Sequence, residues 1–220
     1  MANINEYLER IADKDSRFEL KKFDEKHFEY AKDSFIQCCK SIVPEWKDVH
    51  PNVTENIVRY IVQSDKFEGD LNKGLLLMGK TGTGKTVYLK SLALMMGYTN
   101  NFKFKIYTGF DMEHIYQLDS NNMKVFNLEQ ALKSKMFGID DLGEEHTTIK
   151  RYGTEINVGI DTLTKRHRAF TDNGYLTFAT SNLNSTTLAN KYGARIESRV
   201  HEMFNLIGVK GEDLRKTSVK

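Results

Sequence analysis

Features of secreted or membrane-spanning proteins are missing from this chain. Its 220 residues include two cysteines, Cys38 and Cys39, which are adjacent and therefore poor candidates for a structural disulfide. No apolar run approaches the roughly 18 residues of a membrane helix, and the N-terminus shows no signal-peptide pattern. We therefore expect a cytoplasmic protein with two reduced thiols.

The chain also has few prolines and a small net charge. The two prolines, Pro44 and Pro51, mark the one plausible boundary in the chain. We expect residues 1–48 to form a helical N-terminal extension that packs or docks a partner, and residues 49–220 to form the main domain. The net charge of +2 excludes a chain that is basic as a whole, so any contact with nucleic acid must come from local patches.

Strand-like and helix-like segments alternate from residue 73 onward. The stretch "KGLLLMG" is a short continuous apolar run, typical of a strand that is buried on both faces. This alternation predicts an α/β fold in which helices cover both faces of a parallel five-stranded sheet. The further strands are expected at 102–108, 135–141, 174–182 and 205–209, and the helices at 87–96, 111–118, 127–134, 154–170 and 194–204.

Directly after the first strand stands "GKTGTGKT", which fits the phosphate-loop pattern G-x-x-x-x-G-K-[ST]. Its glycines allow backbone N–H groups to approach phosphate oxygens that side chains would keep away. The following helix offers its positive N-terminal end. Lys85 offers a charge for the β- and γ-phosphates, and Thr86 a hydroxyl for Mg²⁺. The predicted nucleotide-binding residues are Gly79, Lys80, Thr81, Gly82, Thr83, Gly84, Lys85, Thr86 and Val87.

Polar side chains follow two other predicted strands. Asp140 and Asp141 end "KMFGIDD", and Asn182 ends "GYLTFATSN". Open α/β sheets bind ligands at the carboxyl ends of their strands, so we expect these residues near the glycine loop. Asp140 is the candidate metal ligand with Thr86, and Asp141 is the candidate for polarising a water. Asn182, or Thr180 before it, is the candidate contact to the γ-phosphate or to that water. The following Glu144 and Glu145 are expected to be solvated turn residues, with a catalytic role as the less favoured alternative.

Four blocks, "GLLLMGKTGTGKT", "FGIDDLGEE", "FATSNL" and "YGARIESRV", together resemble the AAA+ ATPases. More narrowly, the chain resembles DnaC-type replicative helicase loaders and IstB-type transposase-helper ATPases over about residues 50–217. The resemblance implies a P-loop NTPase fold with little or no helical lid, and an ATPase that uses ATP and Mg²⁺. It assigns the Walker B role to Asp140 and the sensor role to Asn182. Asp141 stands where many AAA+ proteins carry the longer catalytic glutamate.

"YGARIESRV" resembles the arginine-finger block of that family, which implies a homo-oligomer with nucleotide at subunit interfaces. Arg199 is the first candidate for the finger and Arg195 the second; the alternative is a solvated helix face paired with Glu197 or Glu202. Such a finger would meet the charge that develops on the transferred phosphoryl group.

The resemblance implies a DNA replication protein, a loader that acts on single-stranded DNA and a replicative helicase. Two alternatives stay open: a transposition helper that binds duplex DNA, and a nucleotide-dependent adaptor that does not hydrolyse ATP. Candidate DNA contacts are aromatic and basic, although each is better explained as a core aromatic or a solvated charge. They are Tyr107, Phe110, Tyr116, Lys103, Lys105, Lys124 and the run Lys165 to Arg168.

Overall fold

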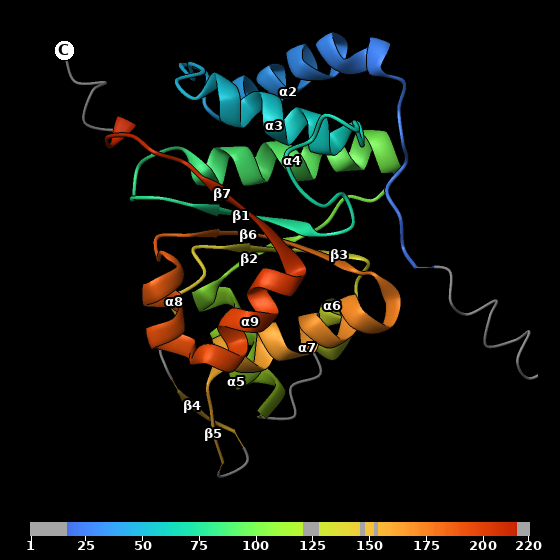
Figure 1. The fold of residues 1–220 in the computed structure, drawn as a ribbon. Coiled ribbons are helices and arrows are strands. Elements are labelled where there is room, and N and C mark those ends of the chain that lie inside the picture. The colour runs from blue at the N-terminus through green and yellow to red at the C-terminus, as the bar shows by residue number, and fades with distance from the viewer. Residues whose placement is uncertain (1–16, 121–127, 146–147, 152–153, 215–220) are drawn as a thin grey trace, which may run out of the picture.

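The computed structural model describes residues 17–120, 128–145, 148–151 and 154–214. Within these ranges, five strands form one sheet in the order β2-β3-β6-β1-β7, and every neighbouring pair is parallel (Figure 1). The predicted five-stranded parallel sheet is therefore confirmed. The strands are β1 (Gly74–Met78), β2 (Ile106–Thr108), β3 (Met136–Asp140), β6 (Leu176–Ser181) and β7 (Phe204–Gly208).

Strand β1 runs through the middle of the protein and is buried from both sides. Leu75 and Leu77 belong to one apolar cluster, whereas Leu76, which points the other way, belongs to a second. Successive side chains of a strand alternate between the two faces of its sheet, so a strand covered on both faces needs an unbroken apolar run. The "LLL" of the sequence supplies that run.

Helices cover both faces of the sheet, as predicted (Figure 1). On one face lie α2 (Phe28–Ile42), α3 (Pro51–Ile61) and α4 (Lys85–Asn100), and a short 3₁₀ turn, η1 (Glu25–His27), precedes α2. On the other face lie α5 (Gly109–Ser120), α6 (Leu128–Leu132), α7 (Val158–Asn173), α8 (Ser185–Tyr192) and α9 (Ala194–Met203). Among the described residues, no helix is both long and apolar enough to cross a membrane.

The described part of the N-terminal extension packs on the main domain. Phe35 and Cys39 of α2 are fully buried in the cluster that also contains α3 and α4. Phe35 stacks on Tyr88 of α4 with 6.2 Å between ring centroids, and the Ser91 hydroxyl of α4 donates to the Cys39 sulfur at 3.2 Å. Helix α2 therefore contributes to the same core as the phosphate-loop helix. The boundary at residue 48 stays a prediction.

The segment before α7 differs from the expected single helix over 154–170. Strands β4 (Ile149–Arg151) and β5 (Thr154–Ile156) form an antiparallel pair, so Ile156 ends a strand rather than belonging to a helix face. Helix α7 begins after Asn157, whose side chain accepts from the Ile160 N–H and caps the helix. The apolar spacing of Ile156 and Ile160 continues across a strand–helix junction, and the Asn157 cap decides where the helix begins.

Candidate functional site

The glycine loop lies between β1 and α4, at the carboxyl edge of the sheet. Gly82 and Gly84 have φ of 84° and 89°, in the left-handed region that other residues adopt only with strain. A Cβ on Gly79 would lie 2.1 Å from the carbonyl oxygen of Val209. A Cβ on Gly82 would lie 1.9 Å from a carboxylate oxygen of Asp213. The loop therefore needs glycine for its turns and for its close contact with the segment after β7.

The Lys85 side chain folds back into this loop. Its ammonium donates to the carbonyl oxygens of Gly79 and Lys80, each at 2.8 Å, and to Oδ1 of Asn182 at 2.7 Å. The residue is only 5 % exposed, so its charge is held in the loop rather than in bulk water. Asn182 follows β6, which neighbours β1 in the sheet. The expected proximity of Lys85 and Asn182 thus arises from adjacent parallel strands.

Asp140 is the last residue of β3, and its carboxylate accepts hydrogen bonds from two hydroxyl groups. The Thr86 hydroxyl of α4 donates to Asp140 Oδ1 at 3.0 Å, and the Thr180 hydroxyl of β6 donates to the same oxygen at 2.7 Å. Mg²⁺ prefers oxygen ligands, keeps several waters and commonly takes only one or two protein carboxylates. A hydroxyl and a carboxylate at this separation fit such an ion. The described residues contain no cluster of three or more His, Cys, Asp or Glu side chains suited to a metal.

The turn after Asp140 is tied firmly to β6. Asp141 has a φ of 55°, uncommon for a residue with a side chain, and its N–H donates to the Thr180 hydroxyl at 2.8 Å. The next N–H, that of Leu142, donates to the Thr180 carbonyl at 2.8 Å. Thr180 therefore binds both the metal candidate Asp140 and the residue that follows it. From the sequence, Thr180 was expected only as a possible phosphate contact. Its hydrogen bonds to Asp140 and Asp141 exist because β6 and β3 are neighbours in the sheet, and the sequence does not show which strands are neighbours.

Of the two glutamates after this turn, Glu144 is exposed as we expected and Glu145 is not. Glu144 is exposed, but its Oε1 accepts from Nδ2 of Asn182. Glu145 is 2 % exposed and accepts from the Tyr192 hydroxyl and from the Gly143 N–H. Burial, together with the neighbouring Glu145 carboxylate, raises the pKa of Tyr192, so its hydroxyl stays a donor. The expectation for Glu145 is wrong because α8, distant in sequence, covers it.

The two candidate finger arginines lie on α9, on the face of the sheet opposite α4 (Figure 1). Arg195 is exposed. Arg199 is partly buried, and its guanidinium donates to the Thr164 hydroxyl of α7 at 2.9 Å. Glu202, the expected alternative partner, instead accepts from the His167 ring at 2.8 Å. Arg199 thus contacts α7, and both arginines belong to the helices on the face of the sheet opposite α4.

The candidate DNA contacts divide into buried and exposed residues. Tyr116 is fully buried and its hydroxyl donates to Asp161 at 2.6 Å, so it cannot stack on a base. Tyr107 is partly buried and stacks on Phe137 with 5.0 Å between ring centroids. Phe110, at the start of α5, is 58 % exposed. Lys124 lies outside the described residues.

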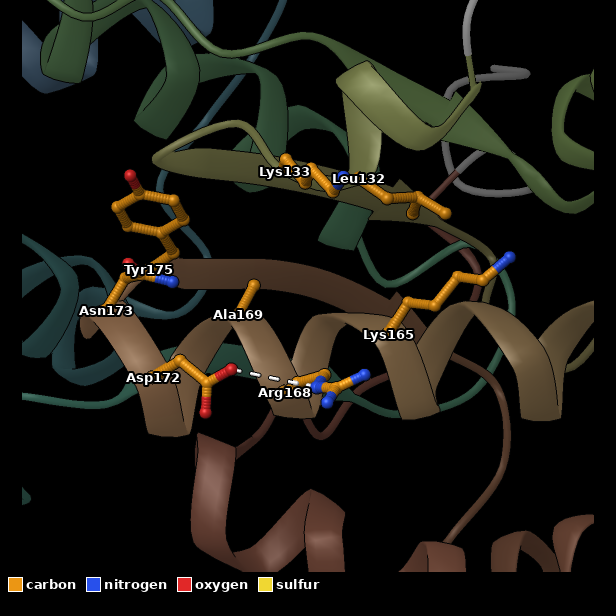
Figure 2. A pocket seen from close by; sticks show the side chains of 8 residues that line it. All are labelled: Leu132, Lys133, Lys165, Arg168, Ala169, Asp172, Asn173 and Tyr175. Atoms are coloured by element: carbon orange, nitrogen blue, oxygen red, sulfur yellow. Dashed lines mark ion pairs between the residues drawn. The ribbon is translucent and has the colours of Figure 1, made fainter.

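The basic run of α7 also divides. Arg166 is fully buried among backbone carbonyls, whereas Lys165 and Arg168 border a pocket of about 430 Å³ between α6 and α7 (Figure 2). Figure 2 shows Arg168 beside Asp172, with 3.7 Å between Nε and Oδ2. Tyr175, which also lines the pocket, immediately precedes β6, so the pocket lies at the edge of the sheet opposite the glycine loop.

One buried nitrogen near the glycine loop has no hydrogen-bond partner among the described residues. It is Nε2 of His50, which precedes α3. A Cβ on Gly211 would lie 3.4 Å from this atom and 4.0 Å from Cγ2 of Thr83, so the imidazole and Thr83 of the loop are both close neighbours of Gly211. A buried polar atom without a partner is costly.

Comparison with known proteins rests on structure. No family model matches the chain, and no curated protein matches its sequence. The DnaC helicase loader is 20% identical with a TM-score of 0.59, covering 74% of this chain and 92% of that one. DnaI is 20% identical with a TM-score of 0.57, and the match covers 80% of this chain and 92% of DnaI. AMPPCP-bound DnaA from Aquifex aeolicus is 15% identical with a TM-score of 0.52, and the match covers 79% of this chain and 50% of the DnaA chain.

At these identities the likeness establishes the fold. The chain shares the α/β fold of the DnaC, DnaI and DnaA structures, in agreement with the fold that the resemblance of its four sequence blocks implies.

Proposed function

We propose that this chain is an ATP-binding and ATP-hydrolysing AAA+ protein of DNA replication, a DnaC-type loader that acts on a replicative helicase and single-stranded DNA. The observation that carries the proposal is the meeting of Lys85, Thr86, Asp140 and Asn182 at one edge of the sheet. The structural likeness to the DnaC helicase loader and to DnaI supports the place of this chemistry in replication. The AMPPCP-bound DnaA structure supports nucleotide binding on this fold.

The residues of the loop would share the recognition of the triphosphate. Backbone N–H groups around Gly82 and the N-terminal end of α4 would bind the phosphates, and Lys85 would add its charge to the β- and γ-oxygens. Thr86 and Asp140 would hold Mg²⁺, which neutralises charge on the phosphate oxygens when bound. The Lys85 ammonium has three hydrogens, so it would exchange one of its carbonyl contacts, with Gly79 or Lys80, for a phosphate oxygen and keep its contact with Asn182. Asp141 would polarise the attacking water as general base, and Asn182 would orient the γ-phosphate or that water.

The first experiment tests nucleotide binding. Lys85→Ala removes a buried charge from the loop, and we expect the Kd for a fluorescent ATP analogue to rise about 100-fold or more. Lys90→Ala, on the exposed side of the same helix, is the matched control and should bind as the wild type does. Thermal melting of both variants shows whether they fold. Unchanged affinity in a folded Lys85→Ala protein would end the proposal.

The second experiment tests hydrolysis and the choice of partner. Phosphate release is measured with and without single-stranded DNA, and the protein is co-purified with the replicative helicase of its source in ATP and Mg²⁺. A loader should hydrolyse ATP and retain the helicase. Tight binding without phosphate release would favour the adaptor. Retention of a transposase and preference for duplex DNA would favour the transposition helper.

The third experiment tests the arginine finger. If Arg199 completes the site of a neighbouring subunit, Arg199→Ala should lose turnover but keep ATP binding. Lys85→Ala subunits still carry Arg199, so mixing the two inactive variants should restore turnover at mixed interfaces. The same mixture made with Arg195→Ala tests the second candidate. Mixtures that stay inactive for both arginines would contradict a finger supplied by α9.

A further inference from the structure

Three side chains form a continuous hydrogen-bonded chain beside the glycine loop. Lys85 Nζ donates to Oδ1 of Asn182 at 2.7 Å, and Nδ2 of the same amide donates to Oε1 of Glu144. They belong to α4, to the residue after β6 and to the turn after β3. Asn182 thus lies between Lys85, which would bind the γ-phosphate, and Glu144, a carboxylate whose role the sequence pattern leaves open.

The chemistry of the two partners determines which way the amide faces. An ammonium group can only donate, so the Asn182 oxygen must face Lys85. An ionised carboxylate can only accept, so the Asn182 nitrogen must face Glu144. Rotating the amide by half a turn would oppose donor to donor and acceptor to acceptor. The contact with Lys85 alone would not fix the amide, because an ammonium can bind many acceptors. The two contacts together, with Lys85 and with Glu144, allow only one orientation of the Asn182 amide.

The turn that carries Glu144 is braced against β6. The Ser181 hydroxyl donates to the Leu142 carbonyl at 2.6 Å, and the Glu144 N–H donates to the Asp141 carbonyl at 3.1 Å. Gly143 has a φ of 105°, which directs the chain back toward β6. Although the Glu144 side chain is exposed, its backbone is therefore held in place beside Asn182. A carboxylate on such a turn can orient a neighbour reproducibly.

We propose that Glu144 is a positioning residue that holds the Asn182 amide in register for catalysis, with its oxygen toward Lys85 and its nitrogen toward Glu144. The Asn182 nitrogen carries two hydrogens, so one remains for the γ-phosphate or the attacking water while the other stays on Glu144. This inference rests on the proposed ATPase function, and it gives Glu144 no proton to transfer. The general-base role stays with Asp141.

Two substitutions separate positioning from proton transfer. Glu144→Ala removes the acceptor, and we expect kcat for ATP to fall about 10-fold while the Kd for ATP stays within about threefold. Glu144→Gln can still offer a carbonyl oxygen to the Asn182 nitrogen but cannot act as a base. It should keep kcat within about threefold of the wild type. The matched control is Glu68→Gln, at an exposed glutamate remote from the loop.

The outcomes are distinct. If Glu144→Gln loses as much kcat as Glu144→Ala, the carboxylate itself takes the proton and positioning is wrong. If Glu144→Ala keeps full kcat, the contact with Asn182 has no catalytic consequence. If Kd rises in step with the loss of kcat, Glu144 supports binding instead. Each of these results overturns the proposal.

A measurement without nucleotide keeps the test independent of ATPase activity. The side-chain NH₂ signals of Asn182, assigned by their loss in Asn182→Ser, can be followed by NMR. In the wild type and in Glu144→Gln they should be protected from exchange with water, and in Glu144→Ala they should move and exchange rapidly. Unmoved signals in Glu144→Ala would refute the positioning contact. A wild-type protein that binds no ATP would refute the proposed function and would leave this NMR result to stand by itself.

Discussion

Arg166 offers a direct test of how the basic run of α7 is used. Its guanidinium donates to the carbonyl oxygens of Leu132, Ser134 and Leu176 at 2.6, 2.8 and 2.7 Å, and to the Thr177 hydroxyl at 2.9 Å. The side chain is fully buried. It thus joins α7 to the end of α6, to the turn before β3 and to the start of β6. We expect Arg166 to stabilise the fold and to contribute nothing directly to DNA binding.

The magnitude follows from the acceptors that remain when the arginine is removed. Arg166→Met keeps most of the apolar stem but leaves three carbonyl oxygens without this donor. At about 1 kcal/mol for each carbonyl, at the low end of the cost of an unsatisfied buried group, the free energy of unfolding should fall by about 3 kcal/mol. For a chain of this length, about 2–4 °C per kcal/mol converts this loss into a fall in Tm of about 6–12 °C.

The assay is thermal unfolding followed by circular dichroism, with Arg168→Met as the matched control. Arg168 lies two residues further along α7, and its side chain is 85% exposed beside Asp172. An exposed ion pair contributes at most about 1 kcal/mol, so the control should melt within about 2–4 °C of the wild type. If Arg166→Met melts as close to the wild type as Arg168→Met does, the carbonyl contacts do not stabilise the fold and the reasoning fails.

Two further predictions concern the metal site and the thiols. Thr180→Val removes the hydroxyl that binds Asp140, and the Mg²⁺ concentration needed for half-maximal ATP hydrolysis should rise about 10- to 100-fold; an unchanged Mg²⁺ dependence would exclude this supporting role. Burial raises the pKa of Cys39 to about 12 and also raises the pKa of the less buried Cys38. A thiol reagent at pH 8 should therefore modify Cys38 slowly and Cys39 only on unfolding, and equal rates in the folded protein would contradict the burial of α2.

Much of the candidate site was predictable because the residues needed to bind phosphate are consecutive in the chain. Gly82 and Gly84 are needed where φ is positive, and Lys85 and Thr86 follow them at once in the chain. The alternation of apolar runs likewise predicts a parallel sheet, because burial of a strand on both faces requires an unbroken apolar stretch. That Asp140 and Asn182 approach the loop follows from the rule for strand ends.

Other features depend on residues that are distant in the sequence. Glu145 is buried because Tyr192 of α8 covers it, and Arg166 is a structural residue because carbonyl groups of two separate segments surround it. No local pattern distinguishes these side chains from solvated charges. Ile156 shows the same limit, because strand pairing with Ile149 rather than apolar spacing decides its conformation.

The sequence by itself determined the phosphate loop, the order along the chain of the five strands of the parallel sheet, and the kinds of side chain at the ends of those strands. Local conformational preference and the chemistry of single residues are sufficient for each of these. Only the tertiary structure decided that Thr180 binds Asp140, and that Asn182 lies between Lys85 and Glu144. The reason is that β3, β6 and β1 are neighbours in the sheet but far apart in the chain, so their contacts exist only once the strands have paired.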